Sequence, residues 1–139
     1  MIKVGQPIVG DEEISAVAEV LRSGRYVQGP RVAEFEQAFA EYIGVSHAVA
    51  VCSGTAALHI SLAAYGLGPA DEVIVPPLTF FSTVTSVLHQ NAIPIFSDIE
   101  SASYCLDPED LARHVTERTK AIIPVHLFGH PTDMDGINA

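Results

Sequence analysis

Two hydroxyl residues flank a glycine at Ser53-Gly54-Thr55, between an apolar run that ends at Cys52 and another that begins at Ala56. This junction is typical of a strand followed by a helix. The free N–H groups at a helix start attract anions, glycine permits close approach, and hydroxyl groups donate to phosphate oxygens. The same residues can simply cap the helix. The pattern alone therefore leaves both phosphate binding and capping open.

The glycine patterns of two common nucleotide sites are absent. No Gly-Lys-Ser/Thr follows Gly54, and the Gly-Leu-Gly at 66–68 lacks a third glycine and precedes a predicted strand instead of following one. A general ATP- or NAD-binding domain is therefore disfavoured.

Two adjacent aromatic residues, Phe80 and Phe81, follow two prolines at the end of a predicted strand. An aromatic ring there could stack on a planar cofactor, and an offset aromatic pair contributes about 0.5–1.5 kcal/mol beyond its buried area. Neighbouring residues of a helix cannot share one face. We therefore expect one ring to face the site and the other to lie in the core.

Strands that alternate with helices position these residues, and they predict an α/β fold with a parallel sheet. The predicted helices cover residues 11–23, 31–43, 55–66, 80–91 and 107–115, and the predicted strands cover 47–52, 72–76, 93–98 and 121–128. Asp107 and Pro108 are expected to start the fifth helix, and Asp133 or Asp135 a sixth. Ligands of such sheets bind beyond the carboxyl ends of the strands, which is where the chemistry-bearing residues fall.

The remaining polar candidates favour structural roles. His126 and His130 lie near a strand end without a third metal ligand, so we expect no metal site, and a place at the site edge stays open for His126. Asp98 is expected to cap a helix or form a turn and not to act in catalysis. Cys52 and Cys105 have no CxxC spacing, which disfavours a disulfide framework and fits a reduced, cytoplasmic setting.

Composition narrows the class of protein. The chain has 139 residues, 48% of them hydrophobic, which suffices for a domain with a core. Its formal charge is −10, and the seven basic residues are scattered, so nucleic-acid binding is disfavoured. The most apolar stretch, 48–68, is interrupted by polar residues, which argues against a membrane span.

Three stretches together resemble the DegT/StrS-type sugar aminotransferases, which use pyridoxal 5'-phosphate (PLP). They are "GRYVQGPRVAEFEQAFAEYIGVSHAVAVCSGTAALHISLAAYGLGPADEVIVPPLTFFSTV", "PIFSDIE" and "TKAIIPVHLFGHPTDMD". The resemblance implies that residues 1–139 form the N-terminal part of the PLP-binding large domain of an aspartate-aminotransferase-like (fold type I) fold, with a parallel or mixed sheet flanked by helices. A helical arm would cover 1–46 and βα units 47–139. Ala70 departs from the family's usual glycine, and we expect only a minor loop change there.

The resemblance also implies site residues. Gly54 and Thr55 would bind the cofactor phosphate with help from Ser53, and Phe80 would stack against the pyridine ring. A second set, Thr79 and Thr83, would lie near the site.

The catalytic residues of the family would lie beyond Ala139, namely the Schiff-base lysine and the aspartate that binds the pyridine nitrogen. Lys3 and Lys120 are poor substitutes, because one lies in a terminal arm and the other begins a strand. The chain alone is therefore expected not to transaminate.

The whole protein would transfer an amino group, with glutamate as the donor, to a nucleotide-linked keto sugar in polysaccharide or deoxyaminosugar biosynthesis. It would act as a homodimer, without a nucleic-acid or membrane partner. A PLP-dependent sugar dehydratase of the same family and a non-catalytic regulatory or assembly domain remain alternatives.

Overall fold

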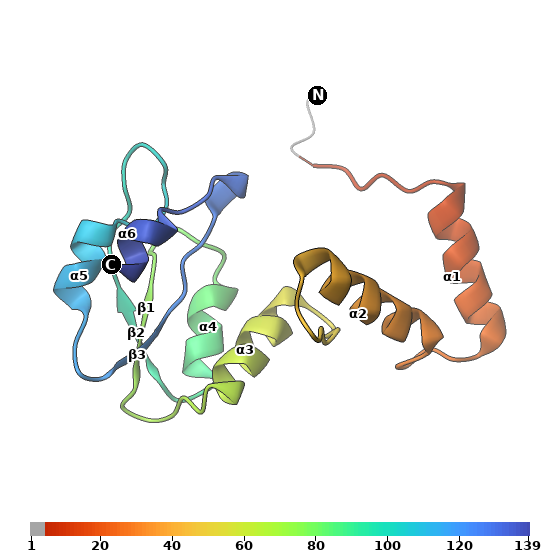
Figure 1. Ribbon diagram of the computed structural model, residues 1–139, viewed down its shortest axis with the longest axis horizontal. Helices are drawn as coiled ribbons and strands as arrows, with labels where there is room; N and C mark the ends of the chain where they lie inside the picture. The colour runs from red at the N-terminus through yellow and green to blue at the C-terminus, as the bar shows by residue number, and fades with distance from the viewer. Residues whose placement is uncertain (1–4) are drawn as a thin grey trace. The chain divides into compact units, whose positions relative to one another are not determined.

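The computed structural model describes residues 5–139, and it divides into two compact units between Ala50 and Val51. The first unit carries two helices, α1 (Asp11–Ser23) and α2 (Pro30–Ile43), drawn in red to orange in Figure 1. Both helices were predicted within one residue of their observed bounds.

Local signals explain these bounds. Gly24 and Gly44 follow α1 and α2 with φ of +70° and +80°, a left-handed conformation that closes a helix and that glycine adopts without steric cost. Pro30 occupies the first turn of α2, where its missing N–H is not needed.

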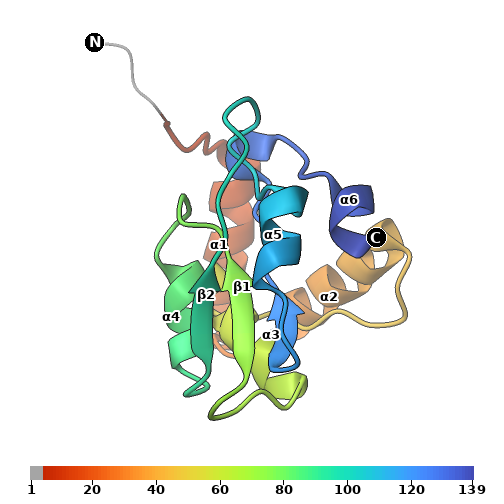
Figure 2. The ribbon, with the colours of Figure 1, turned by 90° about the vertical axis from the view of Figure 1, so that its left-hand side faces the viewer.

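The second unit is a three-stranded parallel sheet between two layers of helices. The strands are β1 (Glu72–Val75), β2 (Ile93–Phe96) and β3 (Thr119–Ile122), and the helices are α3 (Gly54–Ala64), α4 (Ser82–Leu88), α5 (Pro108–His114) and α6 (Met134–Asn138). The strand order is β2-β1-β3. Figures 1 and 2 show α3 and α4 on one face of the sheet and α5 and α6 on the other. The α/β class with parallel strands is confirmed.

The central strand β1 anchors a core on each face of the sheet. Val73 and Val75 pack with Leu62 of α3 and Val87 of α4. Ile74 points the other way and packs with residues that include Leu111 of α5. All of β1 is buried, as expected for a strand that is covered on both faces.

The two predicted helix starts in the second half of the chain are confirmed. The Asp107 side chain accepts a hydrogen bond from the Glu109 N–H at 2.9 Å, with Pro108 as the first residue of α5. Asp133, the first of the two candidates for the last helix, accepts from the Gly136 N–H at 3.0 Å and caps α6.

The predicted buried strand at 47–52 is wrong. The segment is not a strand, and Val49 is 79% exposed. A strand requires a hydrogen-bonded neighbour, and none of the described residues pairs with this segment. The Ala50 N–H donates instead to the Glu36 side chain at 2.7 Å.

The predicted strand at 121–128 is wrong in its second half. β3 begins two residues earlier, at Thr119, and its pairing with β1 ends after the Ile123 N–H donates to the Ile74 carbonyl at 2.9 Å. Pro124 follows and has no N–H to continue the ladder. A short 3₁₀ turn, η1 (Leu127–Gly129), replaces the rest of the expected strand.

The Ala70 loop stores backbone strain. Ala70 is exposed and has a φ of +74°, a conformation that costs a residue with a Cβ about 1–2 kcal/mol. We expect Ala70→Gly to stabilise the chain by about 0.5–1 kcal/mol after the greater chain entropy of unfolded glycine is subtracted. Urea unfolding measures this difference. Ala112→Gly, in α5, should destabilise the chain, so a loss of stability in both variants would contradict the strain argument.

The Asp110 carboxylate of α5 ties that helix to the end of β2. It accepts hydrogen bonds from the Asp98 N–H at 2.7 Å and from the Ser97 hydroxyl at 3.0 Å. The Asp98 N–H is the largest cause that holds the pKa of this carboxyl below its ordinary value, followed by the Ser97 hydroxyl, while partial burial opposes the shift.

A carboxyl with a lowered pKa in the folded state stabilises the fold above its unfolded pKa, and that stabilisation is lost as pH falls through the folded pKa. We therefore expect Asp110→Asn to melt below the unchanged chain at neutral pH. The difference in melting temperature should shrink as pH falls below 3.8, the ordinary pKa of an aspartate side chain. Melting temperatures of both proteins across pH would test this, and a gap that does not change with pH would contradict it.

The amino end of β1 is locked by a buried carboxylate. Glu72 is 2% exposed. Its side chain accepts a 2.5 Å hydrogen bond from the Thr116 hydroxyl and forms an ion pair with Arg118, whose side chain is 63% exposed. The backbone reinforces this contact, because the Glu72 N–H donates to the Arg118 carbonyl at 2.8 Å.

Across residues 5–139, none of the helices is both long enough and apolar enough to cross a membrane.

Candidate cofactor site

The start of α3 combines a cap with open donors. Ser53 is extended, and its hydroxyl oxygen accepts from the Ala56 N–H at 3.1 Å. The backbone N–H groups of Gly54 and Thr55 and the Thr55 hydroxyl have no acceptor among the described residues. Capping and anion binding therefore do not compete here. Ser53 caps the helix, and the Gly54 and Thr55 donors remain available to an anion.

The electrostatic setting of this helix end also suits an anion. The first turn of α3 holds no acidic residue. The start of α1, in contrast, carries three acids, and Glu13 accepts from the Gly10 N–H at 2.6 Å. The partial positive charge at the start of α3, a helix of eleven residues, is thus not neutralised by its own side chains.

Gly54 is not required by the fold. A Cβ at this position would meet no atom within 4 Å, and its φ lies outside the left-handed region. The position that a Cβ would take on Gly54 is therefore open space.

Phe80 and Phe81 form an exposed pair in the connection between β1 and α4. Their ring centroids lie 4.7 Å apart, and the side chains are 67% and 66% exposed. The expectation that one of them lies in the core is wrong. Both residues precede α4, which begins at Ser82, so the alternation of helix faces does not apply to them.

Two hydrogen-bonded threonines, Thr79 and Thr83, lie on either side of Phe80 in the sequence. The Thr79 and Thr83 hydroxyls are hydrogen-bonded at 2.8 Å, and Thr83 is 4% exposed. The sequence placed both residues near the site, but their hydrogen bond was not foreseen. Two threonines spaced four residues apart across a helix start are the signal that could have indicated it.

The Ser53–Thr55 donors and the Phe80 ring precede or begin two neighbouring helices, α3 and α4. α3 and α4 pack against each other, and Figure 1 shows that both begin at the end of the sheet where β1 finishes. The Ser53–Thr55 donors and the Phe80 ring therefore lie at the same end of the second unit. This is the carboxyl edge of the sheet, where ligands of parallel α/β folds bind.

Two further candidates at this edge have structural contacts. The Nδ1 atom of His126 accepts from the Thr132 N–H at 3.0 Å, and the Asp98 side chain accepts from the Ile99 N–H at 2.8 Å. Asp98 forms neither a turn nor a helix cap, because the next residue, Ile99, forms an isolated bridge with Leu106. Within residues 5–139, no group of three or more His, Cys, Asp or Glu side chains could hold a metal ion. Cys52 and Cys105 are free thiols, the first exposed and the second buried.

The one lysine of the described residues lies away from these donors. Lys120 is the second residue of β3 and is exposed, so it sits toward the amino edge of the sheet. Lys3 lies outside the described residues.

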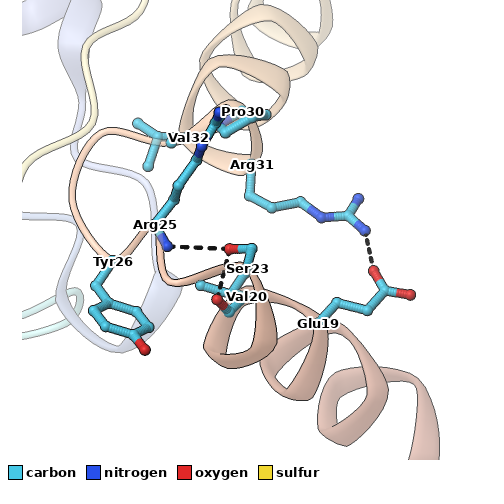
Figure 3. Close-up of a pocket in the computed structure, with 9 residues that line it drawn as sticks. Glu19, Val20, Ser23, Arg25, Tyr26, Pro30, Arg31 and Val32 are labelled. Atoms are coloured by element: carbon cyan, nitrogen blue, oxygen red, sulfur yellow. Dashed lines mark hydrogen bonds and ion pairs between the residues drawn. The ribbon is translucent and has the colours of Figure 1, made fainter.

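A separate cavity of about 320 Å³ opens within the first unit, between the end of α1 and the start of α2 (Figure 3). The ion pair between Arg31 and Glu19, at 2.6 Å, lies at this cavity, as do Arg25 and Tyr26. None of the site residues predicted from the sequence lines it.

The fold and the site together define the class of protein. The chain superimposes on the aminotransferase from Psychrobacter cryohalolentis with a TM-score of 0.90 at 42% identity, over 95% of this chain and 34% of that one. It matches Spr1654 from Streptococcus pneumoniae, in its PLP form, with a TM-score of 0.94 at 36% identity, over 99% of this chain and 35% of that one. The chain thus has the N-terminal third of the fold type I architecture of PLP-dependent aminotransferases.

The family follows from the sequence comparison. Residues 7–139 match the DegT/DnrJ/EryC1/StrS aminotransferase family, and the chain belongs to it. It is 50% identical over 133 residues to the spore coat polysaccharide biosynthesis protein SpsC of Bacillus subtilis (strain 168). This match covers 96% of this chain and 34% of SpsC. The chain therefore spans about a third of the length of these relatives. The resemblance identified in the sequence is confirmed.

Proposed function

We propose that this chain binds the phosphate of PLP at the start of α3, as the N-terminal part of the large domain of a PLP-dependent aminotransferase. The domain would consist of a helical arm over residues 1–46 and βα units over 47–139. The observation that carries the proposal is the set of N–H groups on Gly54 and Thr55 that have no acceptor among the described residues. A Cβ built on Gly54 would also meet no atom within 4 Å.

The residues present suit the two ends of the cofactor. Phosphate oxygens accept from the N–H groups of Gly54 and Thr55 and from the hydroxyl groups of Thr55 and Ser53, and a helix start contributes up to about 2 kcal/mol to holding an anion. The exposed face of Phe80 can stack on a pyridine ring, for about 0.5–1.5 kcal/mol beyond area burial.

The residues described at this edge would bind and orient the cofactor. When bound, PLP supplies the electron sink for amino-group chemistry. Ser53, Gly54 and Thr55 would hold its phosphate, and Phe80 would set the plane of its ring. The residue that carries and moves protons at the reacting carbon is not among those described at this edge, since Lys120 lies toward the other one.

For the whole protein we propose transfer of an amino group from glutamate to a nucleotide-linked keto sugar, in the cytoplasm and as a homodimer. Support comes from family membership and from SpsC, which is described as a spore coat polysaccharide biosynthesis protein. A sugar derivative destined for a polysaccharide fits both.

The test is a crystal of the chain soaked in PLP, together with a transamination assay. We expect density for the phosphate against the Gly54 and Thr55 N–H groups and for the ring against Phe80. With PLP, glutamate and a keto-sugar nucleotide, the 139-residue chain should show no turnover. Phosphate density at a different helix end, or robust turnover by the chain alone, would overturn the proposal.

A further inference from the structure

The direction of the Phe80 ring is not fixed by core packing. Both Phe80 and its neighbour Phe81 are about two-thirds exposed, and their main ring contact is with each other, at 4.7 Å. An exposed side chain on a connecting segment is ordinarily free to change rotamer. A ring that serves as a stacking surface therefore needs a backbone that does not move.

The hydroxyl pair on either side of Phe80 supplies that restraint. Thr79 precedes the ring, Thr83 follows it in the first turn of α4, and their oxygen atoms lie 2.8 Å apart. The Thr83 N–H also donates to the Phe80 carbonyl at 3.1 Å. The five-residue segment 79–83 is thus closed twice, once through side chains and once through the backbone of Phe80 itself.

Thr83 is held firmly on the helix side. It is 4% exposed, so its hydroxyl has little access to water as an alternative partner. Its carbonyl accepts from the buried Ser86 hydroxyl at 2.9 Å. Thr79 is half-buried and lies in the irregular connection after β1, so the helix restrains the connection and not the reverse.

We propose that Thr83, acting through Thr79, is a positioning residue that holds the backbone carrying the Phe80 ring in place for stacking on the cofactor. The role of the ring rests on the proposed function, whereas the restraint on segment 79–83 does not. Binding sites need rigid support behind the residues that touch the ligand, and here one buried hydroxyl provides it.

The test uses four single variants of the full chain and one double variant. Thr83→Val keeps the shape but removes the hydroxyl, and Thr83→Ser keeps the hydroxyl. Thr85→Val is the matched control, because Thr85 lies on the same helix and its hydroxyl donates only to the Ser82 carbonyl, at 3.5 Å. Hydrogen exchange of the Thr83 N–H measures how firmly segment 79–83 is held in the absence of ligand. PLP titration measures the affinity to which the Phe80 ring would contribute.

We expect Thr83→Val to accelerate exchange of the Thr83 N–H and to weaken PLP binding by about three- to tenfold, the usual range for one lost hydrogen bond. Thr83→Ser should restore both, and Thr85→Val should change neither. Thr79→Val should reproduce the Thr83→Val effects, and the double variant should add little, because both changes remove the same bond.

The outcomes separate the two proposals. Unchanged exchange in Thr83→Val would overturn the positioning role, whatever happens to PLP. Faster exchange with unchanged PLP affinity would also overturn it, because the restraint would then be merely structural. If the unchanged chain does not bind PLP, the proposed function fails, and the positioning role fails with it even where exchange in Thr83→Val is accelerated.

Discussion

Gly54→Ala should weaken PLP binding by at least about tenfold, equivalent to about 1.4 kcal/mol, while the chain stays folded. The added methyl group meets no protein atom within 4 Å, so it costs nothing in packing. It would occupy the space from which phosphate oxygens approach the Gly54 and Thr55 N–H groups. Alanine is also a better helix former than glycine, so the melting temperature should be unchanged or slightly raised.

A pair of ligands and a second glycine make this result specific. Titration with pyridoxal, which lacks the phosphate, should give the same weak affinity for Gly54→Ala and for the unchanged chain. Gly68→Ala adds a methyl group that also meets no atom within 4 Å, but in the connection between α3 and β1, and it should bind PLP normally. Equal PLP affinity of Gly54→Ala and Gly68→Ala would place the phosphate elsewhere.

Arg118→Met should destabilise the fold more than Glu72→Gln, although the two changes break the same ion pair. Removal of Arg118 leaves a carboxylate that is 2% exposed with the Thr116 hydroxyl as its remaining side-chain partner. Removing one partner of a buried pair and leaving the other charge buried costs about 3–5 kcal/mol. Glu72→Gln leaves an arginine that is 63% exposed and stays hydrated, so we expect a loss of about 1 kcal/mol.

Urea unfolding of the two single variants and the double variant measures the asymmetry. The double variant should be more stable than Arg118→Met, because the buried charge is gone. Arg31→Met is the matched surface control, since the Arg31 and Glu19 side chains are 56% and 61% exposed, and its loss should stay below about 1 kcal/mol. Equal losses for Arg118→Met and Glu72→Gln would show that burial of Glu72 carries no electrostatic cost.

Helices with local end signals were predictable from the sequence. α1, α2 and α5 lie within one residue of their predicted bounds because capping residues, prolines and terminal glycines act within a few residues of each helix end. α4 has no such signals. It is five residues shorter than expected at 80–91, because Phe80 and Phe81 belong to the connection before it and Asn91, with a φ of +57°, leaves the helical conformation after it.

Strands were harder to predict, because a strand exists only with a partner. The apolar run at 47–52 indicates burial, but it does not show which segment would supply the neighbouring hydrogen bonds. At 121–128 the apolar pattern continued past Pro124, and the missing N–H decided the end of β3. Both errors arise because an apolar run predicts a strand without identifying its hydrogen-bonded neighbour.

The position of the candidate site was predictable, but its geometry was not. Parallel strands place their carboxyl ends at one edge, which accounts for the place of Phe80 after β1. Ser53–Thr55 lie at the same edge through the direction of α3, because the strand expected before them is absent. Whether Ser53 caps the helix, where the Phe80 and Phe81 rings point, and how Thr79 meets Thr83 depend on the turn before each helix. Of these three features, only the contact between Thr79 and Thr83 had a signal in the sequence, namely their spacing of four residues.

The contrast between the two ends of β1 has a consequence for how this scaffold can change over generations. Its amino end is locked by Glu72, whereas the exposed aromatic pair after its carboxyl end contributes little to the core. Diversity introduced at Leu78, Phe80 and Phe81 should therefore be tolerated by folding. Natural drift or a laboratory library could explore new ligand preferences there without first having to rebuild the architecture beneath.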